Sequence, residues 1–80
     1  MTLQEQIIEL VAKELRMKPE LVLPDSDLLR DLGTDSLDAV ELITALEDTF
    51  KVEFADKDHE RIQTVQDIID LVQQLRNKAL

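Results

Sequence analysis

The sequence predicts an all-α protein: a small four-helix bundle of three long helices and one short helix, with a long first loop. Apolar residues recur at helical spacing in three separate segments of the chain. Hydrophobic residues make up 44% of the 80 residues but aromatic residues only 2%, so the core must be built from leucine, isoleucine and valine, which suit packed helices. There is no cysteine for a disulfide or a cysteine-type zinc site, and the length fits one core. We therefore expect residues 1–80 to form a single domain that is stabilised by apolar packing.

The first predicted helix runs from Leu3 to Leu15. Apolar residues recur at every fourth position, at Leu3, Ile7, Val11 and Leu15, which gives the helix one apolar face. Thr2 and Glu5 have the spacing of a capping box, in which each side chain satisfies a free backbone N–H at the helix start.

The second long helix is expected to begin near Ser36, where Asp35 can cap it and Asp38 places negative charge in the first turn. Its apolar positions keep helical spacing at Ala39, Leu42, Ile43, Leu46 and Phe50. The third long helix begins after Thr64, which repeats the capping-box spacing with Asp67. Its buried face is predicted to hold Val65, Ile68, Ile69, Val72 and Leu75.

Two connections complete the predicted fold. Residues 17–34 hold both prolines and the only glycine, yet they contain too many large apolar residues for a solvated linker: Leu21, Val22, Leu23, Leu28, Leu29 and Leu32. We expect this loop to pack across the bundle and to include a helical turn near Ser26 to Leu32. The segment from Asp56 to Arg61 is expected to form the short helix, of one or two turns.

The charge of the chain limits its partners. Eighteen acidic residues against nine basic ones give a formal net charge of −9, which repels phosphate backbones and anionic lipid headgroups. Nucleic acid is therefore a poor partner, and a basic protein surface is a good one. No stretch approaches the roughly 20 apolar residues of a membrane span, and the first residues lack the features of a signal peptide. We expect a cytoplasmic monomer that does not insert stably into membranes.

Most catalytic and metal-binding arrangements are excluded by the residues present. The single His59 lies in a polar run and is interpreted as a solvated surface residue rather than a general base. The acidic segments 25–27 and 56–60 lack the glycine and terminal glutamate spacing of an EF-hand, so a solvated acidic face is the favoured interpretation. No metal site is predicted.

The run from Asp35 to Leu37 is the remaining candidate for chemistry. A serine just inside a helix start is usually only part of the cap, but the neighbours of Ser36 are unusual. On a helical wheel, the side opposite the core carries Leu37, Val40 and Thr44 among the acidic Asp38, Glu41, Glu47 and Asp48. Single apolar surface residues are common, but such a patch beside a serine also suits docking by basic partners that act on that serine.

The run LGTDSLDAVELI, residues 32–43, closely resembles the phosphopantetheine attachment region of acyl carrier proteins. Length, acidity and the predicted order of helices are similar to that family along nearly the whole chain. The resemblance implies that Ser36 carries 4'-phosphopantetheine, transferred from coenzyme A by a separate magnesium-dependent transferase. The terminal thiol of this group would hold acyl chains as thioesters, which makes the protein a carrier and not an enzyme.

The resemblance also implies partners and a cleft for the acyl chain. The partners would be basic surfaces of the phosphopantetheinyl transferase and of the ketosynthase, acyltransferase, reductase and dehydratase enzymes of dissociated fatty acid synthesis. Their predicted docking face comprises Asp35, Leu37, Asp38, Val40, Glu41, Thr44, Glu47 and Asp48. The acyl chain is expected to enter between the second helix and its neighbours, along Ile43, Leu46, Ile62, Ile68 and Ile69.

Some residues depart from the family pattern. Thr34 stands where alanine is frequent, Thr44 where fatty-acid carriers often have methionine, and Phe54 and Ala55 where isoleucine and proline are frequent. Thr44 bears on the choice of partners. A specialised carrier for polyketide, lipid A, peptidyl or aminoacyl chains therefore stays open as an alternative. So do an acidic helical interaction module with an unmodified serine and a small calcium-binding protein.

Overall fold

A computed structural model describes residues 1–78, and this part of the chain is helical. Three long helices, α1 (Leu3–Leu15), α2 (Ser36–Phe50) and α4 (Val65–Lys78), are joined by the short helix α3 (Asp56–His59) and a 3-10 turn, η1 (Pro19–Leu21). The predicted all-α, four-helix architecture is confirmed. The short helix ends at His59, two residues before the predicted end, and η1 was not predicted.

The predicted starts of the long helices are confirmed by their caps. The Glu5 backbone N–H donates to Thr2 Oγ1 over 3.1 Å, and the Thr2 N–H donates to Glu5 Oε1 over the same distance. At the start of α4, the Asp67 N–H donates to Thr64 Oγ1 over 3.2 Å and the Thr64 N–H to Asp67 Oδ2 over 2.9 Å. These caps use only residues within one turn of each other, which is why the sequence alone locates them.

The core lies where α1, α2 and α4 meet. Its fully buried side chains come from one face of each helix: Ile7 and Val11 of α1, Leu46 of α2, and Val65, Ile68 and Val72 of α4. Ala39, which continues the helical spacing of the apolar positions of α2, is exposed.

The long loop is packed only in part. Val22 and Leu28 are buried in the core, as predicted, but Leu21, Leu23 and Leu29 are 54–72% exposed. The expected helical turn is present as a single turn that does not continue into a helix: the Asp31 and Leu32 N–H groups both donate to the carbonyl of Asp27. The loop therefore buries two anchor residues and leaves other apolar side chains on the surface.

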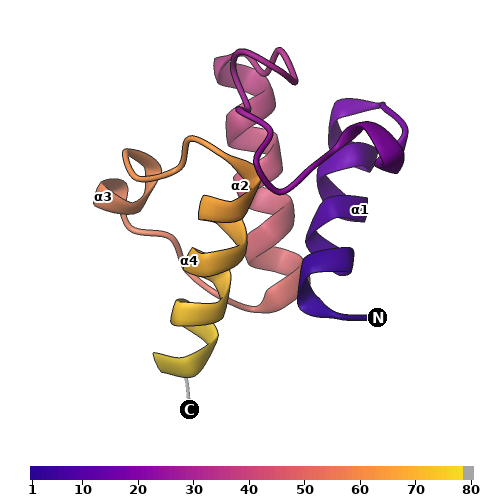
Figure 1. Cartoon of the computed structure of the whole chain (residues 1–80). Helices are drawn as coiled ribbons and strands as arrows, with labels where there is room; N and C mark the ends of the chain where they lie inside the picture. Colours follow the sequence, from indigo (N-terminus) through magenta and orange to yellow (C-terminus); the bar gives the residue numbers. More distant parts are fainter. Residues whose placement is uncertain (79–80) are drawn as a thin grey trace.

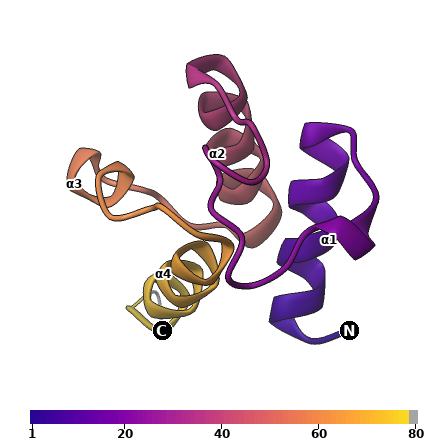
Figure 2. The same cartoon turned by 45° about the horizontal axis from the view of Figure 1, so that its top comes forward.

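The arrangement of the helices gives the bundle two distinct ends. The loop crosses from α1 to α2, and α2 begins at the end of the bundle opposite the start of α1 and the last turns of α4 (Figure 1). The short helix α3 lies to the side, beyond α2 and α4 and away from α1 (Figure 2). Within residues 1–78, no helix is long and apolar enough to cross a membrane.

Candidate functional site

Ser36 is the first residue of α2, and its side chain is exposed. The cap around it is a reciprocal pair of aspartates: the Asp38 N–H donates to Asp35 Oδ1 over 2.8 Å, and the Asp35 N–H donates to Asp38 Oδ2 over 3.3 Å. This pair fixes the backbone on both sides of Ser36. In the described part of the chain, the Ser36 hydroxyl makes no hydrogen bond, so it is available to an incoming group.

The start of α2 can hold a phosphate attached to Ser36. The backbone N–H groups of Ser36 and Leu37 belong to the first turn, where no carbonyl of the same helix can accept them. Together with the positive end of the helix dipole, free N–H groups favour a phosphate at this position and offset repulsion from the two capping carboxylates. The residues present thus fit a phosphodiester on Ser36.

The segment before α2 is held by two residues. Gly33 has a φ of +68°, a left-handed conformation that glycine adopts without strain and that turns the chain into the helix. The Thr34 hydroxyl is buried and donates to the carbonyl of Leu28 over 2.7 Å, and the Thr34 N–H donates to the same oxygen. Thr34, which departs from the family pattern, therefore ties the serine segment to the long loop.

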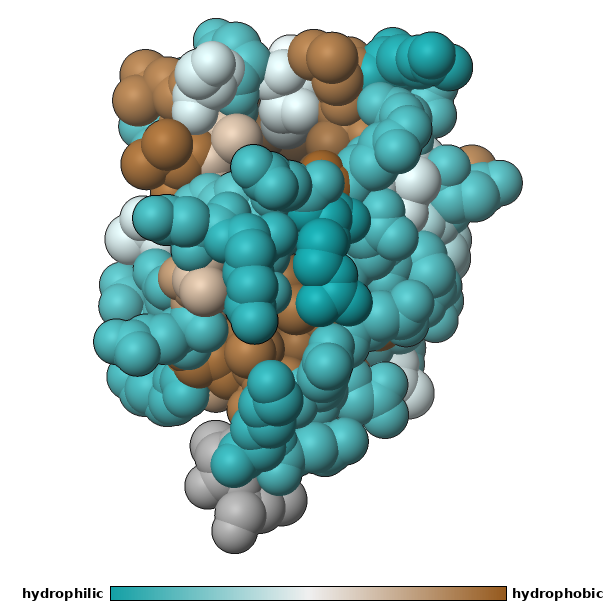
Figure 3. Space-filling view, turned by 90° about the vertical axis from the view of Figure 1, so that its left-hand side faces the viewer, coloured by the Kyte–Doolittle hydropathy of each residue, from teal (hydrophilic) through white to brown (hydrophobic). Residues whose placement is uncertain are grey.

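Most of the predicted docking face is exposed, as the helical wheel indicated. Leu37 and Val40 are 65% and 60% exposed, although apolar. The other exposed members are Asp35, Glu41, Thr44 and Asp48. On the face of the molecule with α3 and α4, apolar surface lies at the end of the bundle where α2 begins, and a second apolar area lies lower on the same face (Figure 3). Asp38 is half-buried because its carboxylate serves the cap.

Glu47 differs from the rest of the predicted docking face. It is half-buried, and its Oε2 accepts the backbone N–H of Phe54 over 2.8 Å. This contact joins the last turns of α2 to the segment before α3, seven residues further along the chain. Glu47 therefore has a structural role that the wheel could not indicate.

A hollow of about 440 Å³ opens beside the first turns of α2. Its apolar lining consists of Leu28, Leu29, Ala39, Ile43 and Ile62, and its polar lining of Asp27, Arg30, Thr34, His59 and Gln63. Of the five residues predicted to line an acyl cleft, Ile43 and Ile62 lie here. Leu46, Ile68 and Ile69 are buried in the core and do not line it. Periodicity could not separate Ile43 from Leu46, Ile68 and Ile69, because all four lie on apolar faces of helices, and Ile62 lies between α3 and α4, where there is no helical spacing to use.

His59 is exposed, as predicted, but it also lines this hollow with Arg30. Neither residue was predicted to be near the site. The sequence placed His59 in the predicted short helix, but only the structure shows that the end of this helix lines the hollow.

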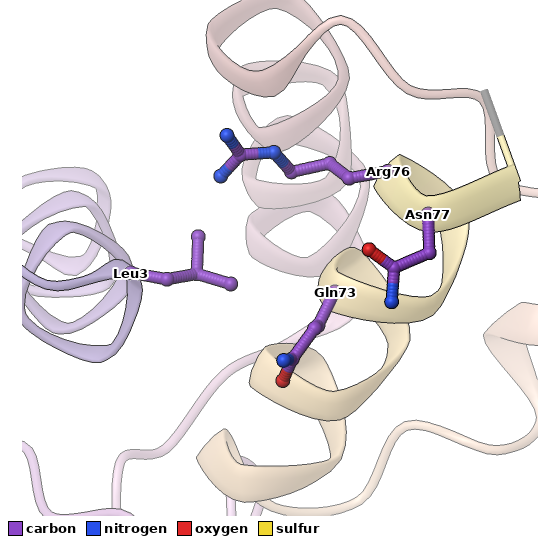
Figure 4. Close-up of a pocket in the computed structure, with 4 residues that line it drawn as sticks. All are labelled: Leu3, Gln73, Arg76 and Asn77. Atoms are coloured by element: carbon purple, nitrogen blue, oxygen red, sulfur yellow. The ribbon is translucent and has the colours of Figure 1, made fainter. Parts of the chain in front are cut away.

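A second hollow, of about 300 Å³, lies between the first turn of α1 and the last turns of α4. It is lined by Leu3, Gln73, Arg76 and Asn77, with Leu3 facing the three α4 side chains across the gap (Figure 4). The Arg76 guanidinium lies 6.0 Å from the centre of the Phe50 ring, at the edge of cation–π distance. This hollow is at the end of the bundle away from the start of α2 (Figure 1).

Comparison with known proteins agrees with this site. A family described as "Phosphopantetheine attachment site" matches residues 5–72. The acyl carrier protein of Syntrophobacter fumaroxidans is 44% identical over 77 residues, which cover 96% of this chain and 93% of that protein. The acyl carrier protein of Syntrophus aciditrophicus is 44% identical over 70 residues, 88% of each chain. A solved structure described as an acyl carrier protein of Mycobacterium tuberculosis superposes with a TM-score of 0.86 at 33% identity, covering 91% of this chain and 97% of that one.

The fold and the site thus define a carrier that holds its cargo through a covalently attached group. The chain belongs to the acyl carrier protein family, whose members are carriers and not enzymes. Its cofactor is 4'-phosphopantetheine, bound covalently. The resemblance seen in the sequence is confirmed.

Proposed function

We propose that Ser36 is the attachment site and that the protein carries growing acyl chains as thioesters in fatty acid biosynthesis in the cytoplasm. One observation carries the choice of residue: among the residues that the structure describes, Ser36 combines an exposed hydroxyl that makes no hydrogen bond with a helix start whose first two backbone N–H groups are free. When bound, the phosphopantetheine group supplies the thiol that forms the thioester. The chain has no cysteine thiolate that could attack this thioester.

The partner enzymes are proposed to dock on the exposed face of α2. The segment from Asp35 to Glu60 holds nine acidic residues and two lysines, Lys51 and Lys57, a net charge of −7. Carboxylates on this face would steer basic surfaces toward Ser36, and the exposed Leu37 and Val40 would anchor them after encounter. This combination favours the transferase and the fatty acid synthesis enzymes as partners.

The proposal is tested by loading the protein with coenzyme A and a broad-specificity phosphopantetheinyl transferase. The chain has two serines, so the site is decided by peptide mass spectrometry of the product. We expect one phosphopantetheine group per chain, on the peptide that contains Ser36. A group on Ser26, or no group at all, contradicts the proposal.

The branch of metabolism is tested separately. The loaded protein should serve as substrate for a ketosynthase and a reductase of fatty acid synthesis at rates similar to those of a fatty acid carrier. Loading without turnover by these enzymes would favour a specialised carrier instead.

A further inference from the structure

The hollow beside α2 has a mixed lining that a plain hydrocarbon chain does not require. Half of the residues that line it are apolar and half are polar. When a saturated chain displaces water from a polar group, the hydrogen bond to that water is lost and not replaced, which makes binding of the chain less favourable. The polar half therefore bears on which chains the hollow accepts.

Three of the five polar residues are already used by the fold. Asp27 accepts backbone N–H groups of its own turn at 2.9 and 3.0 Å and the Gln63 side-chain amide at 3.1 Å. These hydrogen bonds hold the pKa of Asp27 below its usual value, and the bond from the Arg30 backbone N–H contributes most. The Thr34 hydroxyl is bonded to the Leu28 carbonyl. These groups position the wall of the hollow and are not free to select cargo.

The side chains of Arg30 and His59 are different. Both are exposed at the hollow, and within residues 1–78 neither side chain makes a hydrogen bond or ion pair. Each carries N–H groups that can donate. They come from separate segments, Arg30 from the long loop and His59 from the end of α3, so two segments bring donors to one hollow.

We propose that His59, assisted by Arg30, makes this carrier favour acyl chains that bear a hydroxyl or keto oxygen over saturated chains of the same length. A hydroxyl or keto oxygen on the acyl chain can accept a hydrogen bond from these side chains. This bond replaces the one that the side chains made to water before the chain entered the hollow. A saturated chain in the same hollow leaves the donors without an acceptor. This inference rests on the proposed function, because it requires acyl chains to be attached at Ser36.

The experiment compares octanoyl and 3-hydroxyoctanoyl groups, each loaded from its coenzyme A thioester by a broad-specificity phosphopantetheinyl transferase. The readout is the rate at which hydroxylamine cleaves each thioester, divided by the rate for the same thioester of free pantetheine. A chain held in the hollow protects its thioester, so we expect the parent protein to protect the hydroxylated chain more. Selectivity is measured as the normalised rate for the octanoyl thioester divided by the normalised rate for the 3-hydroxyoctanoyl thioester. This ratio should be above 1 in the parent protein.

Substitutions assign the selectivity to its residues. His59→Leu should reduce the ratio about fivefold, the size expected for one net hydrogen bond. His59→Gln keeps a donor and should preserve most of the selectivity, and Arg30→Gln should reduce it less than His59→Leu does. Lys57→Leu is the matched control, since Lys57 is exposed on the same short helix but does not line this hollow.

Equal ratios for the parent and His59→Leu would overturn the inference, as would an equal loss in Lys57→Leu. A parent protein that takes up neither chain would overturn the proposed function and this inference together. Loading on Ser36 without selectivity between the two chains would overturn this inference alone.

Discussion

The chain contains two Asp-Ser pairs ten residues apart, Asp25-Ser26 and Asp35-Ser36, and they have opposite surroundings. Ser26 is 6% exposed, and its Oγ accepts the Leu23 N–H over 3.0 Å. Ser36 is exposed and its hydroxyl is unbonded within the described residues. The same dipeptide thus holds a buried, hydrogen-bonded serine in the loop and an exposed serine at the helix start.

The backbone around the two serines differs in the same way. The Val65 N–H donates to the carbonyl of Ser26 over 3.1 Å, and the Gln66 N–H donates to the carbonyl of Pro24 over 2.8 Å. The first two backbone N–H groups of α4, which have no acceptor within the helix, are therefore bonded to the loop. Within residues 1–78, no carbonyl accepts the backbone N–H groups of Ser36 and Leu37 at the start of α2. The start of α4 holds the fold together, whereas the start of α2 is left open for a ligand.

The largest expected effect is on loading. Ser36→Ala should abolish phosphopantetheine transfer because the attacking oxygen is gone, while the free energy of unfolding falls by about 1 kcal/mol or less. Ser26→Ala should be loaded at the parent rate but lose about 2 kcal/mol, because the half-buried Leu23 N–H loses its acceptor. Intact-mass measurement and thermal melting test the pair. Loading of Ser36→Ala, or loss of loading in a folded Ser26→Ala, would break the comparison.

A second pair of variants compares packing near the two helix starts. Val65, the first residue of α4, is fully buried, whereas Val40 is 60% exposed on α2. Val65→Ala should cost about 2 kcal/mol, which lowers the melting temperature of a domain this size by roughly 10 °C. Val40→Ala should change stability by less than about 0.5 kcal/mol but slow loading. Similar melting temperatures for the two variants would contradict the assignment.

The third prediction divides the docking face into free and bonded carboxylates. Glu41→Lys should leave the melting temperature nearly unchanged and slow loading most at low salt, since it weakens steering of a basic partner. Glu47→Lys should slow loading as well, and should also cost about 1 kcal/mol because the Phe54 N–H loses its acceptor. Loading rates at two salt concentrations, with melting as the control, check both. Unchanged loading of Glu41→Lys at low salt would mean that the acidic face only solubilises the protein.

The smallest expected effect is on the stability of the protein at low pH. Hydrogen bonds from the backbone N–H groups of Thr64 and Gln63 hold the pKa of Asp67 below its usual value, the former most strongly. A carboxylate with a lowered pKa in the folded state stabilises the protein above its unfolded pKa, about 4, and this contribution is lost as the pH falls through the folded value. Asp67→Asn should therefore make the melting temperature less sensitive to pH as the pH falls below about 4. A parallel acid response in parent and variant would contradict this role.

The elements and caps were predictable from the sequence because they depend on neighbouring residues. Thr2 with Glu5 and Thr64 with Asp67 bond within a single turn, and the apolar faces of the long helices follow from spacing. Ser36 was likewise singled out as the candidate attachment site from its local run and the wheel around it.

Contacts between distant segments could not be predicted in this way. The bond from Phe54 to Glu47, the division of the cleft candidates between core and hollow, and the meeting of Arg30 with His59 all depend on how segments pack. Helical spacing likewise does not show that Ala39, an apolar position of α2, is exposed beside the hollow.

Amide hydrogen exchange at the two helix starts, measured before and after loading, tests the central claim most directly. In the unloaded protein, the Ser36 and Leu37 amides should exchange fast, and the Val65 and Gln66 amides should be protected because they donate to the loop. Attachment of phosphopantetheine should slow exchange at Ser36 and Leu37 and leave Val65 and Gln66 unchanged. Equal protection of the two starts before loading, or no change at Ser36 and Leu37 after it, would contradict the account.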